Sequence, residues 1–282
     1  MMSENKVIGF IGAGALATAL IKGLLAAEVV KPSEIMVTDM DGSKLEQMVE
    51  RWRVQARDKG QLIEQADIVI LAVKPKDIAA VMEEIGAKLN KKHVLISVAA
   101  GIPTSFIEGF CKENIKVIRV MPNTSATVLE SATAIARGKY AGDTAEQSAA
   151  MIFAAVGKVE LVKEELLDVI TGLSGSGPAY AYYMVEALEQ AGERLGLPKE
   201  IAQSFVVQTL FGAAKMLVET AEKPENLRTA VTSPGGTTYA GLQALDAHGF
   251  HKAVFAAVEA AANRSKEMQA EFTGISGGVT CD

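Results

Sequence analysis

The sequence predicts an α/β protein with a parallel sheet in its N-terminal half and an all-helical C-terminal half. Up to about residue 162, short runs rich in β-branched residues alternate with helical patterns, and such alternation is typical of parallel strands joined by helices. From about residue 163, long Ala-, Leu-, Met- and Glu-rich stretches follow a helical period, with no comparable strand-like run. We therefore expect two domains, 1–162 and 163–282.

The expected strands share short runs of Val, Ile and Ala. They are Val7–Ile11, Ile35–Thr38, Ile68–Val73, Val94–Ser97, Val117–Val120, Ala132–Ala136 and Val159–Leu161. The helices expected between them are Gly14–Ala26, Ser43–Arg51, Lys76–Lys88, Thr104–Cys111 and Ala145–Ala155, several of which open on a capping Ser or Thr. The alternation implies that neighbouring strands pair in parallel.

Composition and charge limit the partners. The 282-residue chain is 49% hydrophobic, with a net charge of −6 and a pI near 5.3. Nucleic acid and anionic membranes attract basic surfaces, so this acidic chain favours a small-molecule partner over either. We expect no membrane span, because the run Val7–Ile21 contains glycines and no other run approaches the roughly 20 apolar residues that a span needs.

The cysteines and histidines predict neither a disulfide framework nor a metal site. Cys111 and Cys281 lie far apart, and no histidine–carboxylate pattern has metal-ligand spacing. We expect a cytoplasmic protein without a bound metal. His93, His248 and His251 need no catalytic role, because lone histidines are more often structural or solvent-exposed than catalytic.

A glycine-rich turn follows the first expected strand. Gly12, Gly14 and Ala17 form the pattern G-x-G-x-x-A, with Ala13 and Leu16 among the intervening residues. Gly12 permits the tight turn, Gly14 lets a pyrophosphate approach the backbone, and Ala17 allows close packing of the helix. The helix N-terminus offers free N–H groups to the anion. This order of strand, turn and helix predicts a Rossmann-like dinucleotide-binding domain.

Asp39 ends the second expected strand, where a carboxylate of a dinucleotide-binding domain hydrogen-bonds the ribose hydroxyls of adenosine. It would repel a 2′-phosphate, and this favours NADH over NADPH. Two alternatives stay open. Lys44 and Arg57 could meet a phosphate, and Asp39 could simply start a turn with Asp41 and Gly42.

Three further loops lie beyond the carboxyl ends of expected strands, where ligands bind in open parallel sheets. They supply the candidate cofactor-binding residues Val73, Lys74 and Pro75, then Ala99, then Met121 and Asn123. Their backbone groups could contact a nicotinamide ribose and amide, with the Asn123 side chain near the ring. Tight turns without a ligand are the alternative.

Two glycine-rich motifs mark the helical half. Residues 175–180 read Gly-Ser-Gly-Pro-Ala-Tyr at the opening of a helix, and residues 232–238 read Thr-Ser-Pro-Gly-Gly-Thr-Thr before a helix expected from Tyr239. The second motif would present another helix N-terminus to an anion, such as a substrate carboxylate. A capped turn between two helices is the alternative.

These motifs together resemble the pyrroline-5-carboxylate reductase family over essentially the whole chain. The resemblance rests on Gly9–Ala17, Ala72–Pro75, Met121–Thr124 and the two motifs of the helical half. It implies reduction of the cyclic imine Δ1-pyrroline-5-carboxylate to L-proline with NADH or NADPH. It also implies that the C-terminal domain interleaves with that of a second copy, in a homodimer or a larger ring of dimers.

The resemblance also implies a substrate site. Thr238 would hydrogen-bond the ring nitrogen of the substrate as the catalytic residue, and backbone groups around Gly236 and Thr237 would hold its carboxylate. The candidate substrate-binding residues are Ser233, Gly235, Gly236, Thr237, Thr238 and Gly175. Because a threonine hydroxyl is a weak acid, we expect the iminium form of the substrate to accept the hydride, with catalysis resting on proximity and orientation.

One departure and two alternatives accompany this resemblance. Relatives often carry Asn-Arg-Ser at residues 39–41, where this chain has Asp-Met-Asp, so the arginine that would bind a 2′-phosphate is missing and the usual preference for NADPH is in doubt. A β-hydroxyacid dehydrogenase shares the two-domain plan but needs a lysine soon after a glycine-rich helix start, and residues 172–183 contain none. A dinucleotide-binding sensor without turnover would not need the loop at residues 233–238.

Overall fold

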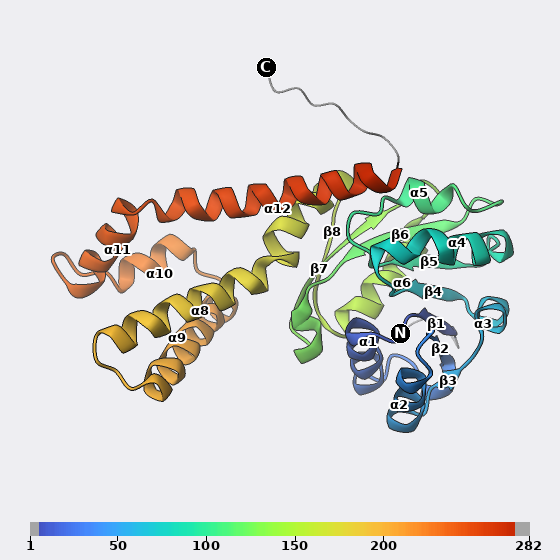
Figure 1. Cartoon of the computed structure of the whole chain (residues 1–282), viewed down its shortest axis with the longest axis horizontal. Coiled ribbons are helices and arrows are strands. Elements are labelled where there is room, and N and C mark those ends of the chain that lie inside the picture. Colours follow the sequence, from blue (N-terminus) through green and yellow to red (C-terminus); the bar gives the residue numbers. More distant parts are fainter. Residues whose placement is uncertain (1–5, 274–282) are drawn as a thin grey trace, which may run out of the picture. The chain divides into compact units, whose positions relative to one another are not determined.

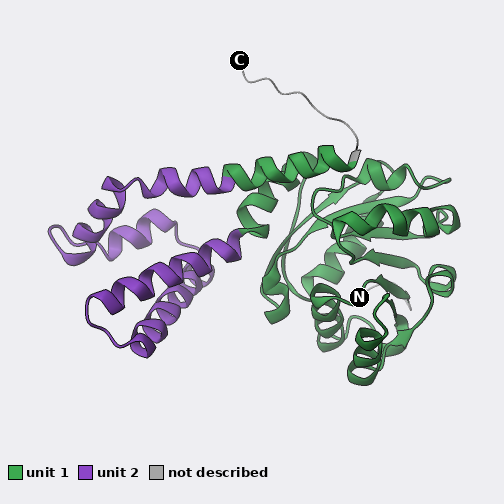
Figure 2. Ribbon diagram, in the orientation of Figure 1, with its two compact units in different colours: residues 1–176, 259–282 green, residues 177–258 purple. Residues whose placement is uncertain are grey.

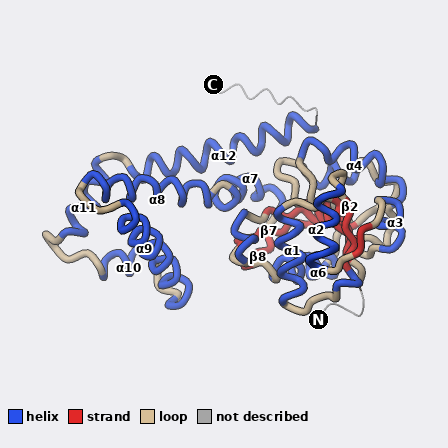
Figure 3. Tube along the Cα trace, turned by 60° about the horizontal axis from the view of Figure 1, so that its bottom comes forward, coloured by secondary structure: helices blue, strands red, loops and turns tan. Residues whose placement is uncertain are grey.

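The computed structural model describes residues 6–273 and divides the chain into two compact units. Unit 1 comprises residues 1–176 and 259–282, and unit 2 comprises residues 177–258 (Figure 2). Among the described residues, all strands belong to unit 1, and unit 2 consists of helices and loops (Figure 3). The domain boundary expected after residue 162 stays a prediction.

Unit 1 is built on one eight-stranded sheet in the order β3-β2-β1-β4-β5-β6-β7-β8 (Figure 1). The strands are β1 Ile8–Ile11, β2 Ile35–Thr38, β3 Gln55–Ala56, β4 Ile68–Leu71, β5 Val94–Ser97, β6 Lys116–Met121, β7 Ser131–Arg137 and β8 Gly157–Leu161. The order reverses between β1 and β4, and in an open sheet this switch point is where a dinucleotide binds. The predicted α/β class with a Rossmann-like N-terminal part is confirmed.

Helices cover both faces of the sheet, because alternate strand residues are buried on opposite sides. Ile8 and Phe10 pack on one face, against α1 (Ala15–Ala26), α2 (Gly42–Trp52) and α6 (Asp143–Ala154). Ile11 packs on the other face. The helices on that side are α3 (Lys59–Gln65), α4 (Ile78–Ile85) and α5 (Thr104–Glu108). Burial on both faces explains the nearly continuous apolar runs of the central strands.

One strand pair corrects the expectation of parallel pairing throughout. β7 runs antiparallel to β6, with Val120 opposite Ile135. The loop between them, residues 122–130, contains only the short 3₁₀ helix Thr124–Val128. A parallel return needs a crossover of a dozen or more residues, so this short loop can only reverse the chain.

Gly23 lies where α1 packs most closely on the chain after α6, and its replacement is expected to destabilise unit 1. A Cβ at Gly23 would clash with the Ala155 carbonyl oxygen. Overpacking of this kind costs about 1–3 kcal/mol, so Gly23→Ala should lower the midpoint of chemical or thermal unfolding. Gly42→Ala is the matched control, since no heavy atom lies within 4 Å of the added Cβ. Equal midpoints for the two variants would contradict this account.

Cys111 follows α5 and is half-buried, and its thiol donates to the Ile107 carbonyl at 3.6 Å. Burial, and then the charge of Glu108, raise the pKa of this thiol from its ordinary 9.0 to about 11. Because the thiolate is the reactive form, we expect alkylation near pH 7 to be about 100-fold slower than for an ordinary cysteine.

Iodoacetamide labelling followed by mass spectrometry checks this in a Cys281→Ala variant, in which Cys111 is the remaining cysteine. The rate for the folded protein is compared with that for the denatured chain. Equal rates would show that folding does not protect the thiol. Cys281 itself lies outside the described residues.

A buried ion-pair network holds the second half of α12 (Phe250–Thr273) to unit 1. The Asp168 carboxylate, in α7 (Leu167–Ile170), accepts from Ser265 Oγ at 2.7 Å and from Arg119 Nη2 at 3.4 Å. Arg119 is 3% exposed and also pairs with Glu164 at 3.5 Å. Glu164 in turn accepts from the N–H and hydroxyl of Thr104. The three charged groups and the two hydroxyls of this network thereby have partners, as burial requires.

Unit 2 exposes many large apolar side chains. Its helices are α8 (Gly177–Arg194), α9 (Lys199–Thr220), α10 (Pro224–Ala230), α11 (Thr237–Ala247) and the first part of α12. Tyr183 in α8 is 77% exposed, and Phe205 and Val218 in α9 are 69% and 82% exposed. Apolar surface of this extent marks an interaction site.

One of these helices corrects the expectation that no segment approaches a membrane span. By length and composition alone, α9 could cross a bilayer. An exposed apolar helix face can be covered by lipid or by another protein surface, and composition does not distinguish the two.

Candidate dinucleotide and substrate site

The glycine-rich turn has the geometry that an anion site requires. Gly12 has φ = +108°, and a Cβ there would lie 2.5 Å from the Ala72 carbonyl oxygen, so both backbone conformation and space demand glycine. Gly14 is the N-cap of α1 and has open space where a Cβ would stand. No side chain caps this N-terminus within the described chain, and the first-turn N–H groups therefore face that space.

Asp39 is fixed against the same turn. Its Oδ2 accepts from the Ala13 N–H at 2.6 Å, and its Oδ1 accepts from the Asp41 N–H at 2.9 Å. The carboxylate thus stands beside the glycine-rich turn in one orientation. Because the Ala13 N–H donates to Asp39, Ala13 positions this carboxylate and its N–H is not offered to a ligand.

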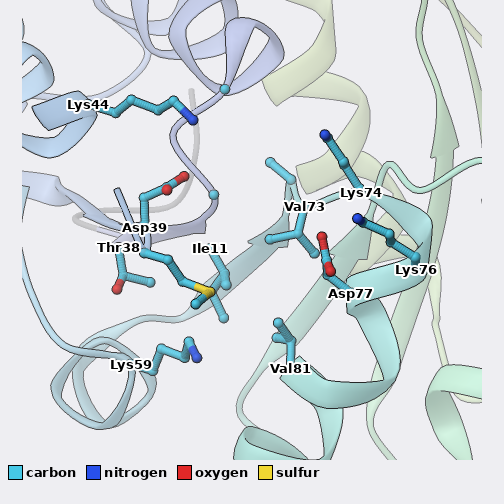
Figure 4. A pocket seen from close by; sticks show the side chains of 14 residues that line it. Ile11, Thr38, Asp39, Lys44, Lys59, Val73, Lys74, Lys76, Asp77 and Val81 are labelled. Atoms are coloured by element: carbon cyan, nitrogen blue, oxygen red, sulfur yellow. The ribbon is translucent and has the colours of Figure 1, made fainter. Parts of the chain in front are cut away.

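A cavity of about 320 Å³ opens between this turn and the strand ends of β2 and β4. Figure 4 shows Asp39 and Lys44 on one side of it and Lys74 and Lys76 on the other. Of the residues predicted to bind the cofactor, the cavity is lined by Gly12, Gly14, Asp39, Val73 and Lys74. Sequence reasoning did not single out Thr38, Met40, Lys59, Lys76, Asp77 and Val81, which line it as well.

A second cavity, of about 330 Å³, lies at the carboxyl ends of β5 and β6. The predicted residues Leu16, Met121, Asn123 and Gly175 line it, together with Ala15, Val98, Pro122, Thr124, Ala126 and Thr127. Gly14 lines the first cavity and Ala15 the second, so the start of α1 lies between them. Two nucleoside halves joined by a pyrophosphate fit this arrangement, with the pyrophosphate at the free helix N-terminus.

Four predicted cofactor residues do not line either cavity. Ala13 and Ala17 are buried, and Ala17 is fully enclosed where α1 packs on the sheet. Ala99 is also buried, and its N–H bonds to Ser97 Oγ at 3.3 Å. Pro75 begins the 3₁₀ turn Pro75–Asp77 beyond Lys74. These residues shape the loops around the cavities.

The polar atoms of the Asn123 side chain are hydrogen-bonded to other residues of the protein. Its Nδ2 donates to the carbonyl oxygen and to the hydroxyl of Ser174, both at 3.3 Å, and its Oδ1 accepts from the Ser125 N–H at 3.1 Å. Its polar atoms are therefore engaged within the protein while its surface lines the cavity.

The predicted substrate loop lies in unit 2, and its sequence explains its shape. The Gly236 N–H donates to the Ser233 carbonyl at 3.0 Å, and Gly235 has φ = +69°. Pro and Gly at the two central positions of such a turn are typical of type II. A Cβ at Gly236 would clash with Ser233 Oγ.

α11 starts directly after this turn, at Thr237, two residues before the predicted start at Tyr239. Gly236 is its N-cap, and within the described part of the chain no side chain caps it. The first-turn N–H groups, including that of Thr238, are thus presented beside an exposed Thr238 hydroxyl. An anion is the ligand that this geometry suits.

None of the three histidines lines either cavity. His93 is 1% exposed, and its ring nitrogens contact the Asn90 N–H and the Ile63 carbonyl, both at 2.9 Å. His248 and His251 lie at the surface of unit 2. Among the described residues, no group of three or more His, Cys, Asp or Glu side chains is placed to hold a metal ion.

Comparison with known proteins decides the family. A family model described as pyrroline-5-carboxylate reductase dimerisation matches residues 164–268, and one described as NADP oxidoreductase coenzyme F420-dependent matches residues 7–101. Pyrroline-5-carboxylate reductase 1 of Bacillus subtilis is 42% identical over 271 residues, which cover 95% of this chain and 91% of that protein. The chain belongs to the pyrroline-5-carboxylate reductase family.

Solved structures agree with this assignment. A pyrroline-5-carboxylate reductase from Coxiella burnetii superposes with a TM-score of 0.89 at 38% identity, covering 94% of this chain and 99% of that one. A pyrroline carboxylate reductase from Plasmodium falciparum, solved with NADP bound, gives a TM-score of 0.82 at 30% identity and the same coverage. The predicted resemblance to pyrroline-5-carboxylate reductases is confirmed, and the chain is a nicotinamide-dependent oxidoreductase.

Proposed function

We propose that the chain transfers hydride from NAD(P)H to Δ1-pyrroline-5-carboxylate and so forms L-proline, in the last step of proline biosynthesis. The observation that carries this proposal is the full-length match to reductases of that name, at 42% identity across 95% of the chain. The match also favours this reaction over that of a β-hydroxyacid dehydrogenase. The two cavities on either side of the α1 N-terminus supply space for the dinucleotide.

The cavity beside Asp39, where the adenosine of the cofactor would bind, favours NADH. Asp39 is held rigidly by two backbone N–H groups, so a 2′-phosphate could not displace its carboxylate without breaking both bonds. Two of the four lysines that line this cavity have acidic partners, since Lys44 pairs with Asp41 and Lys59 pairs with Glu84. Family resemblance and the NADP-bound Plasmodium structure are the arguments for NADPH.

The residues that we propose to bind the substrate are Gly175 and, in the loop before α11, Ser233, Gly235, Gly236, Thr237 and Thr238. The N–H groups at the start of α11 would hold the substrate carboxylate without a basic side chain. The Thr238 hydroxyl would hydrogen-bond the ring nitrogen and orient the imine carbon. The nicotinamide supplies the hydride, so the protein needs no strong acid or base and contributes position and orientation.

The family model supports self-association, because it is one of dimerisation and covers all of unit 2. We propose an interleaved homodimer, or a larger ring of dimers, in which the exposed apolar faces of α8 and α9 are covered by a second copy rather than by lipid. Residues 163–282 would then form the substrate-binding and dimerisation domain. A cytoplasmic location is part of this proposal, and a reducing compartment suits the free thiol of Cys111.

The test is the loss of absorbance of NADH, and separately of NADPH, when Δ1-pyrroline-5-carboxylate is added to the purified protein. Oxidation that depends on the imine, with proline as the product, supports the proposal. Protein that binds the dinucleotide but oxidises neither cofactor would be a sensor, and the proposed reaction would be wrong. Light scattering on the same sample reports the oligomeric state.

A further inference from the structure

Asn123 links the end of β6 to the start of the helical region. All the polar atoms of its side chain bond to other residues of the protein. Besides the two Nδ2 bonds to Ser174, its backbone N–H donates to Ser131 Oγ at 3.1 Å. Ser131 is the first residue of β7 and is 1% exposed. Asn123 therefore connects three segments at the rim of the second cavity.

Ser174 belongs to a π-helical turn, Thr171–Gly175, which the Ser176 N–H closes by donating to the Thr171 carbonyl at 2.9 Å. π-Helical turns are rare and frequently occur at functional sites. Contacts from outside the helix can support such a wide turn. Here the support comes from Asn123 and from a bond between Ser174 Oγ and the Ala132 carbonyl at 3.3 Å.

The turn also contributes directly to the cavity wall. Gly175 lines the second cavity, and a Cβ there would lie 2.5 Å from Met121 Cε. Gly175 thus touches the side chain that ends β6 and lines the same cavity. A shift of the π-helical turn would move Gly175 relative to Met121 and change the shape of the cavity.

We propose that Asn123 is a positioning residue that holds the π-helical turn Thr171–Gly175 and so sets the shape of the nicotinamide end of the cofactor site. This inference rests on the proposed function for the identity of the ligand, and on the hydrogen bonds of Asn123 for its mechanism. Direct contact of the Asn123 amide with the nicotinamide is the competing role, and it would require the Ser174 bonds to break. Hydride transfer depends steeply on the placement of the two carbon centres, so a small shift matters.

The variants separate the two roles. Asn123→Ala removes both hydrogen bonds to Ser174. Asn123→Asp keeps the side-chain shape but places a carboxylate oxygen beside the Ser174 carbonyl oxygen. Ser174→Ala removes one of the two acceptors. The matched control is Asn90→Ala, which removes a bond between an asparagine side chain and the Lys92 N–H. Asn90 lies in the turn before β5, at the amino end of that strand, whereas Asn123 follows the carboxyl end of β6.

The measurements include readouts that do not depend on turnover. For Asn123→Ala and Asn123→Asp we expect the Kd of ADP-ribose, which lacks the nicotinamide, to stay within about 3-fold of wild type, while kcat falls about 10- to 100-fold. The fluorescence enhancement of bound NADH should fall in the same variants, because the nicotinamide end of the cavity has lost its shape. Asn90→Ala should leave all three quantities unchanged.

A double-mutant cycle decides between positioning and direct contact. Positioning predicts that Ser174→Ala lowers kcat about 3- to 10-fold and that the loss in the double variant is smaller than the product of the two single losses. A wild-type kcat for Ser174→Ala, or a loss in the double variant equal to that product, would overturn the inference. Failure of wild-type protein to reduce the imine would instead overturn the proposed function. The NADH fluorescence and the ADP-ribose binding would still test whether the bonds between Asn123 and Ser174 set the shape of the cavity.

Discussion

Replacing Asp39 with serine is expected to lower the ratio of kcat/KM for NADH to kcat/KM for NADPH by about 100-fold. The variant removes the carboxylate that we propose to hydrogen-bond the ribose hydroxyls of NADH and to repel a 2′-phosphate. Serine can still accept a hydrogen bond from the Ala13 N–H, so the glycine-rich turn keeps part of its support. Steady-state oxidation of both cofactors measures the ratio.

Asp41→Ser is the matched control for this change. Asp41 carries the same charge two residues away, but its carboxylate caps α2 by accepting from the Ser43 N–H at 3.1 Å and does not line the cavity. Serine caps a helix about as well as aspartate, so this substitution should change the stability little and leave the cofactor ratio within about 2-fold of wild type. A similar fall in both variants would mean that general surface charge, rather than Asp39, sets the preference.

The bounds of the central strands could be predicted closely because side chains on both faces of these strands are buried. β2 and β5 have the predicted bounds, Ile35–Thr38 and Val94–Ser97. All four residues in each strand are buried, so each strand appears in the sequence as a short run dominated by β-branched and aliphatic residues between polar segments. The phosphate-binding turn could be predicted for a similar reason, since Gly12 and Gly14 lie directly between a buried strand and a helix.

Elements stabilised by their neighbours could not be predicted. β3 has two residues, Gln55 and Ala56, which pair with Met36 and Val37 of β2 and carry no apolar run of their own. Because β3 and α3 were not predicted, Lys59 was not expected at the cavity. The ion-pair network around Arg119 is equally invisible in sequence, since it joins residues 104, 119, 164, 168 and 265.

Side-chain roles were less predictable than positions. Asp39 stands where the motif places it, but its bond to the Ala13 N–H depends on how β2 and the glycine-rich turn meet in space. Asn123 lines the expected cavity, and yet its amide bonds to Ser174, which is 51 residues away along the chain. Spacing in a sequence identifies the strand end at which a residue lies and leaves its hydrogen-bond partners undetermined.

Replacing Thr238 with alanine is expected to lower kcat for Δ1-pyrroline-5-carboxylate about 10- to 100-fold, with the Kd of NADH unchanged. The variant removes the hydroxyl proposed to hold the ring nitrogen, while the turn at Ser233–Gly236 and the free N–H groups of α11 remain. Thr238→Ser should keep most of the activity. Thr229→Ala is the matched control, because the Thr229 hydroxyl bonds only to the Glu225 carbonyl of its own helix.

The pH profile distinguishes orientation from proton donation. If Thr238 only orients an iminium that arrives protonated, kcat/KM declines as pH rises through the pKa of the substrate imine, and Thr238→Ala lowers the whole profile without moving its midpoint. A midpoint that shifts in the alanine variant would show that the hydroxyl takes part in proton transfer. Unchanged kcat in that variant would remove Thr238 from the active site and leave the α11 N-terminus as the remaining feature of unit 2 proposed to hold the substrate.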